Sequence, residues 1–259
     1  MPVNIFKRVW DYCTYNIPFF LFVLILLLAT NIIEDFFLKD FDDTIALVIQ
    51  FMINIVLWGY GMQITRDRIN GGKRLPKLLP KVMVSLGVKL VLVSTVYVFI
   101  QGTILDFICA PLNFPTYDLD EMLLDLPNTI HEIYSHDPAS VIIFFVVGTI
   151  LFYITMFFLE IAIAKLADTG SLLEAFNLKS IFRSIHAWGW WNYTKEYTLL
   201  LITMTILFYM QLLDLDIFGL DYFIDTFLMF LIFATQFMGI GAVYAKMKVA
   251  EAEKSEESG

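Results

Sequence analysis

Six long runs of apolar residues, separated by polar turns, constrain this chain more than any other feature of its 259 residues. A helix needs roughly 20 mostly apolar residues to cross a bilayer, because its backbone rises about 1.5 Å per residue. Hydrophobic residues make up 59% of the chain, against roughly 45–50% in a typical soluble domain. The runs predict membrane-spanning helices at residues 17–33, 44–64, 82–108, 140–163, 197–213 and 217–245.

The charged residues between these runs predict an orientation. Lys and Arg collect in cytoplasmic loops, because their transfer across the membrane is unfavourable. With six spans, 15 of the 17 basic residues lie on one side, Lys39 lies on the other, and Lys89 lies within the third span. We therefore expect an all-α polytopic membrane helix bundle of about six transmembrane helices in the cell membrane, with both termini cytoplasmic. It forms one domain over residues 1–248, and a disordered polar tail is expected over 249–259.

The opposite side of the membrane is predicted to be acidic. Sixteen carboxylates lie there together with a single basic residue. Two interpretations remain open: a well-solvated surface that repels other negative surfaces, or a mouth that attracts cations.

Two cytoplasmic segments, 73–81 and 171–186, are predicted to lie on the membrane surface without crossing it. In the second, apolar residues recur at helical spacing with Glu174 and Lys179 on the other face, and Ser171 is placed to cap the helix. Aromatic residues that favour the membrane–water interface follow directly: Trp188, Trp190, Trp191 and Tyr193. These segments are the expected interfacial amphipathic helices of the cytoplasmic side.

Two ionisable residues, Lys89 and Glu160, are predicted to lie at similar depths inside the bilayer. Each is eight positions from a charged residue at the cytoplasmic end of its span, a depth of roughly 12 Å. Because an isolated charge is costly in hydrocarbon, we expect the two side chains to form an ion pair. The pair either fixes how the third and fourth spans pack or acts as a site that couples protons or ions.

Both cytoplasmic loops resemble the signatures of a prokaryotic, largely archaeal family known only as domain of unknown function 4013. Residues similar to the first signature are Tyr60, Arg66, Gly71, Leu75, Pro76, Gly87, Lys89 and Tyr97. Residues similar to the second are Asp168, Thr169, Gly170, Ser171, Ala175, Phe176, Asn177, Trp188 and Gly189. After Pro76 the family tends to show acidic and aromatic residues, whereas this chain has basic residues at 77 and 81.

The resemblance covers roughly residues 59–213 and implies a multi-pass cell-membrane protein. It supplies no known activity. The residues that it marks on the cytoplasmic surface as candidates for a functional motif are Arg66, Gly71, Leu75, Pro76, Gly170 and Phe176.

Several functional classes are disfavoured by the sequence. A net charge of −9 argues against a nucleic-acid partner. No hydrolase or phosphate-loop signature is present, so neither an enzyme nor a cofactor is expected. His131 and His136 are five positions apart, whereas a zinc helix needs four, so no metal site is predicted. The two cysteines, Cys13 and Cys109, are expected on opposite sides of the membrane as free thiols.

Two functions remain after these exclusions. The favoured one is a non-catalytic membrane-organising, accessory or scaffold component, whose partners are the lipid bilayer and either further copies of itself or other membrane subunits. The alternative is a small transporter or channel for ions or small solutes. The interfacial helices and the few polar residues in the spans favour the first. The acidic side of the membrane, a possible duplication of the helical hairpin, and Lys89 with Glu160 favour the second.

Overall fold

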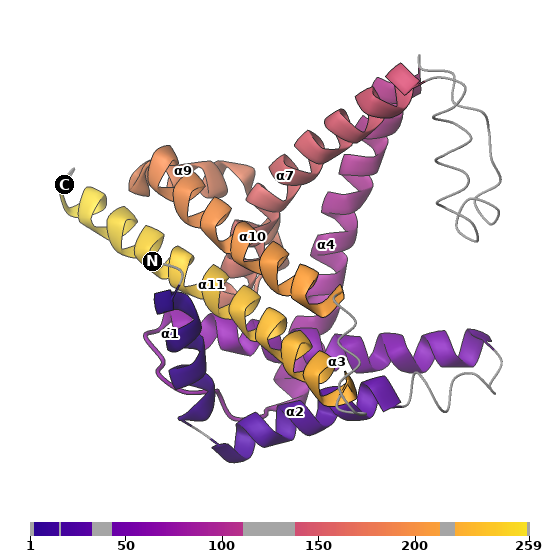
Figure 1. Cartoon of the computed structure of the whole chain (residues 1–259). Coiled ribbons are helices and arrows are strands. Elements are labelled where there is room, and N and C mark those ends of the chain that lie inside the picture. Colours follow the sequence, from indigo (N-terminus) through magenta and orange to yellow (C-terminus); the bar gives the residue numbers. More distant parts are fainter. Residues whose placement is uncertain (1–2, 16, 33–42, 111–137, 213–220, 258–259) are drawn as a thin grey trace. The chain divides into compact units, whose positions relative to one another are not determined.

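The computed structural model describes residues 3–15, 17–32, 43–110, 138–212 and 221–257, and over these ranges it is helical without strands (Figure 1). The predicted all-α class is therefore confirmed. The helices are α1 (Val3–Thr14), α2 (Ile17–Ile32), α3 (Asp43–Ile69), α4 (Pro80–Cys109), α7 (Pro138–Thr169), α8 (Leu172–Phe176), α9 (Leu178–Trp188), α10 (Trp190–Leu212) and α11 (Asp221–Glu257).

Four helices among the described residues are long and apolar enough to cross a membrane. These candidate spans are Val48–Ile69, Pro80–Cys109, Pro138–Thr169 and Phe223–Glu256. The first and fifth predicted spans correspond to α2 and α10. The described part of α2 has only 16 residues, and the second turn of α10 contains Lys195 and Glu196.

The disorder predicted for the C-terminal tail is not what the structure has. Helix α11 continues without a break through Glu257, so most of the segment 249–259 is helical. The extra turns are held by side-chain contacts with α9. Glu251 accepts a hydrogen bond from Arg183, and Lys254 donates one to the carbonyl oxygen of His186. Composition alone indicated disorder, because it does not show these partners.

The helices divide into two compact units, residues 1–93 with 160–259 and residues 94–159. In the first unit, α11 lies beside α3, α10, α2 and α9 (Figure 1). Glycines allow close packing there: a Cβ atom on Gly59 would overlap the Met83 carbonyl of α4, and one on Gly61 would overlap the Phe237 ring of α11. Thr65 also donates a 2.9 Å hydrogen bond to the Phe237 carbonyl oxygen. Helix α3 therefore packs tightly on two neighbours at once.

The second unit contains the C-terminal part of α4 from Ser94 and the N-terminal part of α7 up to Leu159. Large apolar side chains cover much of its surface. They include Val98, Phe99, Ile104, Phe107, Ile142, Phe145, Ile150 and Phe152, all exposed. Such a surface is stable against lipid tails, whereas soluble monomers rarely expose apolar patches of this extent.

Candidate functional site

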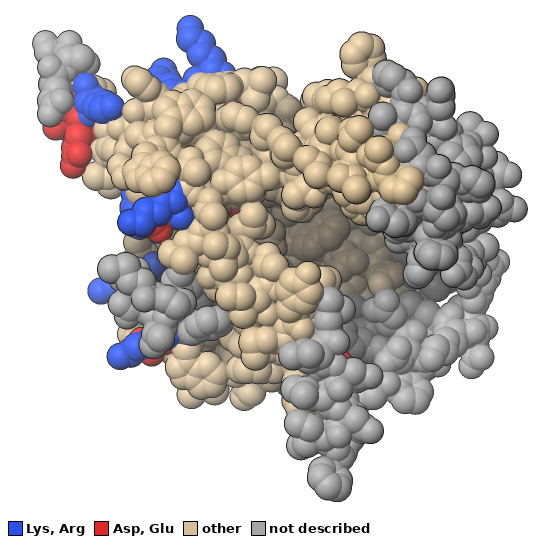
Figure 2. Space-filling model, turned by 45° about the horizontal axis from the view of Figure 1, so that its top comes forward, with Lys and Arg blue, Asp and Glu red and all other residues tan. Residues whose placement is uncertain are grey.

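On the face of the molecule that Figure 2 shows, charged side chains gather in one region, and uncharged residues cover most of the other described surface. This region, which we call the charged end, consists of the C-terminal ends of α3, α7 and α11, helix α9, and the start of α10. It carries both loops with the family-like residues. We take it as the candidate functional site.

The first loop, residues 70–79, reverses the chain after α3. Gly71 adopts φ +78°, a left-handed conformation that glycine tolerates best. The Gly72 N–H donates to the Asp67 carbonyl (2.8 Å), and the Arg68 guanidinium donates to the Gly72 carbonyl (2.8 Å). The side chain of Arg66 is exposed. Arg66 thus belongs to this turn without having a buried side chain.

The rest of the first loop packs against α3. Leu75 is only 1% exposed, the Tyr60 hydroxyl donates to the Pro76 carbonyl (3.1 Å), and the Gln63 amide donates to the Leu79 carbonyl (3.3 Å). The predicted surface segment 73–81 is therefore an extended loop fixed to α3, and α4 starts at Pro80. The proline-containing sequence does not form a helix there, because proline disfavours helical geometry in the preceding residue.

Helix α1 packs onto the same turn. The Tyr12 hydroxyl donates a 2.7 Å hydrogen bond to Asp67 Oδ2, and the Arg68 guanidinium lies 5.5 Å from the centroid of the Tyr12 ring. Burial, followed by the hydrogen bond to the Asp67 carboxylate, raises the pKa of Tyr12 well above its usual range. Burial also raises the pKa of the neighbouring Cys13 thiol to about 12. The N-terminal helix is thus anchored at the charged end.

The second loop begins where α7 ends. Gly170 adopts φ +70°, and its N–H donates to the Leu166 carbonyl (2.8 Å), an arrangement that closes a helix C-terminus. Two short helices follow, where a single amphipathic helix over 171–186 was expected. Ser171 makes no side-chain capping bond, whereas the Asn177 side chain accepts from the Ser180 N–H (3.0 Å) and caps α9. Phe176, on α8, is partly exposed.

Lys89 joins the two loops. Its ammonium donates a 2.7 Å hydrogen bond to the Gly170 carbonyl oxygen. The expected ion pair with Glu160 is absent from the described residues. The physical reason is that the last carbonyls of α7 have no partners within the helix and carry partial negative charge, which attracts a cation. The predicted motif residues Lys89 and Gly170 therefore meet, whereas Lys89 and Glu160 do not pair.

A second lysine, Lys165, is buried in the last turns of α7 and is only 4% exposed. Its ammonium donates to Ser180 Oγ of α9 (2.9 Å) and lies 5.5 Å from the Tyr244 ring centroid of α11. One turn along α9, Ser184 donates to Glu251 Oε2 of α11 (3.0 Å). These five residues, which we call the lysine cluster, connect α7, α9 and α11.

In the sequence, Lys165 is only one of the 15 basic residues predicted on the cytoplasmic side. A signal for its burial was present, because Lys165 interrupts an otherwise apolar run from Ile161 to Ala167, all of which is buried. Ser180, Ser184 and Glu251 gave no comparable signal. Ser180 is 15 positions from Lys165, and Glu251 is 67 positions from Ser184. These side chains therefore meet only when the helices pack together.

Three ion pairs fix the end of α11 on its neighbours. Lys246 binds Glu196 of α10 (2.8 Å), Lys248 binds Asp168 of α7 (2.8 Å), and Glu251 binds Arg183 of α9 (2.9 Å). Exposed pairs of this kind each contribute only about 0–1 kcal/mol. Their main effect is therefore to set the register of α11 against three other helices.

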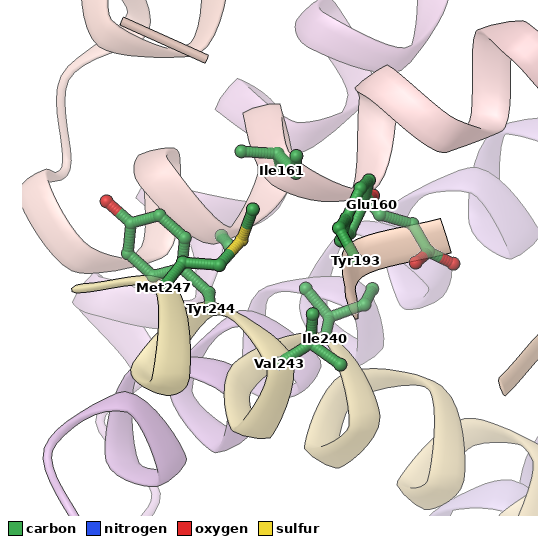
Figure 3. Close-up of a pocket in the computed structure, with 8 residues that line it drawn as sticks. Glu160, Ile161, Tyr193, Ile240, Val243, Tyr244 and Met247 are labelled. Carbon is green, nitrogen blue, oxygen red and sulfur yellow. The ribbon is translucent and has the colours of Figure 1, made fainter. Parts of the chain in front are cut away.

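A small pocket adjoins this site between α7, α10 and α11 (Figure 3). Its volume of about 10 Å³ is roughly the space that one water molecule needs. Glu160 lies beside Tyr193 at one side of the pocket, and its carboxylate points away from Tyr244 and Met247 (Figure 3). Tyr193 was expected in the interfacial belt, but its side chain is buried. The remaining lining is apolar: Ile161, Ala164, Ile240 and Val243.

The long apolar helices and the polar network at one end define an α-helical protein of membrane-spanning character. A family model described as "Protein of unknown function (DUF4013)" matches residues 44–245. The chain therefore belongs to the DUF4013 family, as its two loops predicted. No match was found among curated proteins or among solved structures.

Proposed function

We propose that this protein is a six-span protein of the cell membrane, with both termini cytoplasmic, that serves as a non-catalytic membrane-organising or accessory component. Its partners in this role are other membrane subunits or further copies of itself. One observation carries the proposal: three lysines of the charged end bind acceptors of the protein itself. Lys89 binds the Gly170 carbonyl, Lys165 binds Ser180, and Lys248 binds Asp168. This arrangement favours a rigid structural end over an open passage.

The contacts of α11 support a crossing by α10. The C-terminal part of α11 binds Asp168 at the end of α7 and Glu196 near the start of α10. Helix α10 thus starts at the charged end, where α11 finishes. The chain must therefore reach the opposite end before α11 begins. The 23 residues of α10 can cover about 34 Å at 1.5 Å per residue, which is enough to cross the hydrocarbon core.

The position of α1 supports a crossing by α2 in the same way. Tyr12 binds Asp67 at the C-terminal end of α3, whereas α3 begins at Asp43. These two ends of α3 are roughly 36 Å apart at 1.5 Å per residue. The segment that contains α2 must span this length, so we assign α2 as the first crossing. Six crossings then return both termini to the basic side, in agreement with the positive-inside rule.

The topology is tested by labelling single cysteines with a membrane-impermeant maleimide on intact cells. In a Cys13→Ala, Cys109→Ala background, Asp42→Cys and Asp216→Cys should react from outside. Ser255→Cys should react only after the membrane is opened. If Asp216→Cys reacts only from inside, α10 does not cross and the six-span proposal is wrong.

The functional class is tested by ion flux. The purified full chain, reconstituted in liposomes, should release K⁺, Na⁺ and H⁺ no faster than protein-free liposomes. A flux that depends on the protein would contradict the accessory role and support a small transporter or channel. That alternative is favoured by the carboxylate of Glu160 in a candidate span and by the predicted acidic side of the membrane.

A further inference from the structure

Glu160 is the feature of the site that the accessory role leaves unused. It lies on α7 inside the candidate span Pro138–Thr169, nine positions before the end of the helix, or roughly 13 Å along its axis. Its chain neighbours Leu159 and Ile161 are both buried. The Glu160 side chain is itself half-buried, and its position in the chain places it within the apolar part of the helix, away from the charged end.

No hydrogen bond or ion pair reaches the Glu160 carboxylate from the described part of the chain. The cations that could have paired with it are engaged elsewhere. Lys89 of α4 binds the Gly170 carbonyl, and Lys165 of α7 binds Ser180. The titratable groups that share the pocket with Glu160 are Tyr193 of α10 and Tyr244 of α11, and neither side chain is a cation.

Among the described residues, the pocket that Glu160 helps to line offers no second ligand to the carboxylate, which points away from Tyr244 and Met247 (Figure 3). The pocket has room for about one water molecule, which is too small for an organic solute. Apart from Glu160 and the two tyrosines it is lined by hydrocarbon and one thioether. A bare metal cation needs several oxygen ligands at once, and this lining does not provide them. A proton needs only the carboxylate itself.

We propose that Glu160 is a proton-binding site within the membrane-spanning part of the protein, which holds a neutral carboxylic acid at neutral pH. An ionised carboxylate without a partner is strongly disfavoured in hydrocarbon, so the neutral form is the stable one. This inference does not depend on the accessory role proposed above.

The test uses dicyclohexylcarbodiimide, an apolar reagent that adds to protonated carboxyl groups in the lipid phase. The full chain is reconstituted in phosphatidylcholine liposomes, treated across a range of pH, and the modified residue is identified by mass spectrometry. We expect modification at Glu160 near neutral pH. It should fall about tenfold per pH unit once the acid ionises. Glu160→Gln should remove this modification, and Glu174→Gln, at the charged end, should leave it intact.

Three outcomes would overturn the proposal. The first is no modification of Glu160 at any pH, and the second is modification that does not change with pH. The third is protection by Na⁺ at constant pH, which would assign the site to a metal cation. Lys89→Met should leave the modification of Glu160 unchanged, because the two residues do not pair; a rise would show that they pair in the bilayer. As an independent readout, Glu160→Gln should lose an infrared carbonyl band of a neutral carboxylic acid.

Discussion

The Lys89 ammonium donates a 2.7 Å hydrogen bond to the carbonyl oxygen of Gly170, which lies 81 positions further along the chain. This bond connects the two family-like loops and places a cation at the C-terminus of α7. A cation there interacts favourably with the helix dipole. It also satisfies a carbonyl that the helix itself leaves without a partner.

Replacement of Lys89 should therefore weaken the junction between α4 and α7. We expect Lys89→Met to lower the free energy of unfolding by about 1–2 kcal/mol, measured as a lower unfolding midpoint in detergent. Lys77→Met is the matched control, because Lys77 is exposed on the first loop; it should change the midpoint little. Equal midpoints for the two variants would mean that the Lys89 bond contributes nothing.

Leu75 should stabilise the first loop by burial. It is 1% exposed, whereas Leu79 in the same loop is 53% exposed. Leu75→Ala should cost about 2–5 kcal/mol, because it leaves a cavity as well as losing buried hydrocarbon. Leu79→Ala should cost less than about 0.5 kcal/mol. Denaturant unfolding of both variants gives the comparison, and similar losses would show that the loop does not pack as described.

Gly59 should be essential for the close packing of α3 on α4. A Cβ atom there would overlap the backbone carbonyl of Met83, which cannot rotate away as a side chain could. Gly59→Ala should therefore lower the stability by about 1–3 kcal/mol. The control is Gly102→Ala, because the space around Gly102 is open within 4 Å and alanine favours a helix. A thermal shift assay should separate the two variants, and a neutral Gly59→Ala would refute the close contact.

Tyr12 should make the stability depend on alkaline pH. Its pKa is raised in the folded protein, mainly by burial and then by the hydrogen bond to Asp67. The unfolded chain loses the Tyr12 proton above about pH 10, whereas the folded protein keeps it, so rising pH favours unfolding. The stability advantage over Tyr12→Phe should be constant below about pH 9 and shrink above pH 10. Tryptophan-fluorescence unfolding at several pH values measures it, and a constant difference up to pH 11 would argue against the raised pKa.

The Cys13 thiol should resist alkylation in the folded protein. It is buried, and burial raises its pKa to about 12, so almost no reactive thiolate is present at pH 8. In a Cys109→Ala background, maleimide should modify Cys13 only after unfolding. Tyr15→Cys in a background lacking both natural cysteines should react rapidly, because position 15 is exposed. Equal reaction rates at the two positions would show that α1 is not docked.

Much of the helical organisation could be predicted from local sequence. Apolar runs and glycine-containing turns place α3, α4 and α7 within a few residues of their observed bounds, apart from their polar ends. Gly71 and Gly170, which the family resemblance marks in the two cytoplasmic loops, both adopt positive φ. Such features depend on short segments, because helical hydrogen bonds join residues four positions apart.

The sequence by itself determined that this chain forms long apolar helices, concentrates its basic residues in a few connecting segments, and belongs to the DUF4013 family. Only the tertiary structure decided that Lys89 binds Gly170 instead of Glu160, that Lys165 is buried against Ser180, and that α11 continues past residue 249. The physical reason is that apolar length and local hydrogen bonding are properties of single segments. The partner of a charged group depends instead on how helices distant in sequence pack together. Glu160 remains without a partner among the described residues, because this packing brings Lys89 to Gly170 and Lys165 to Ser180.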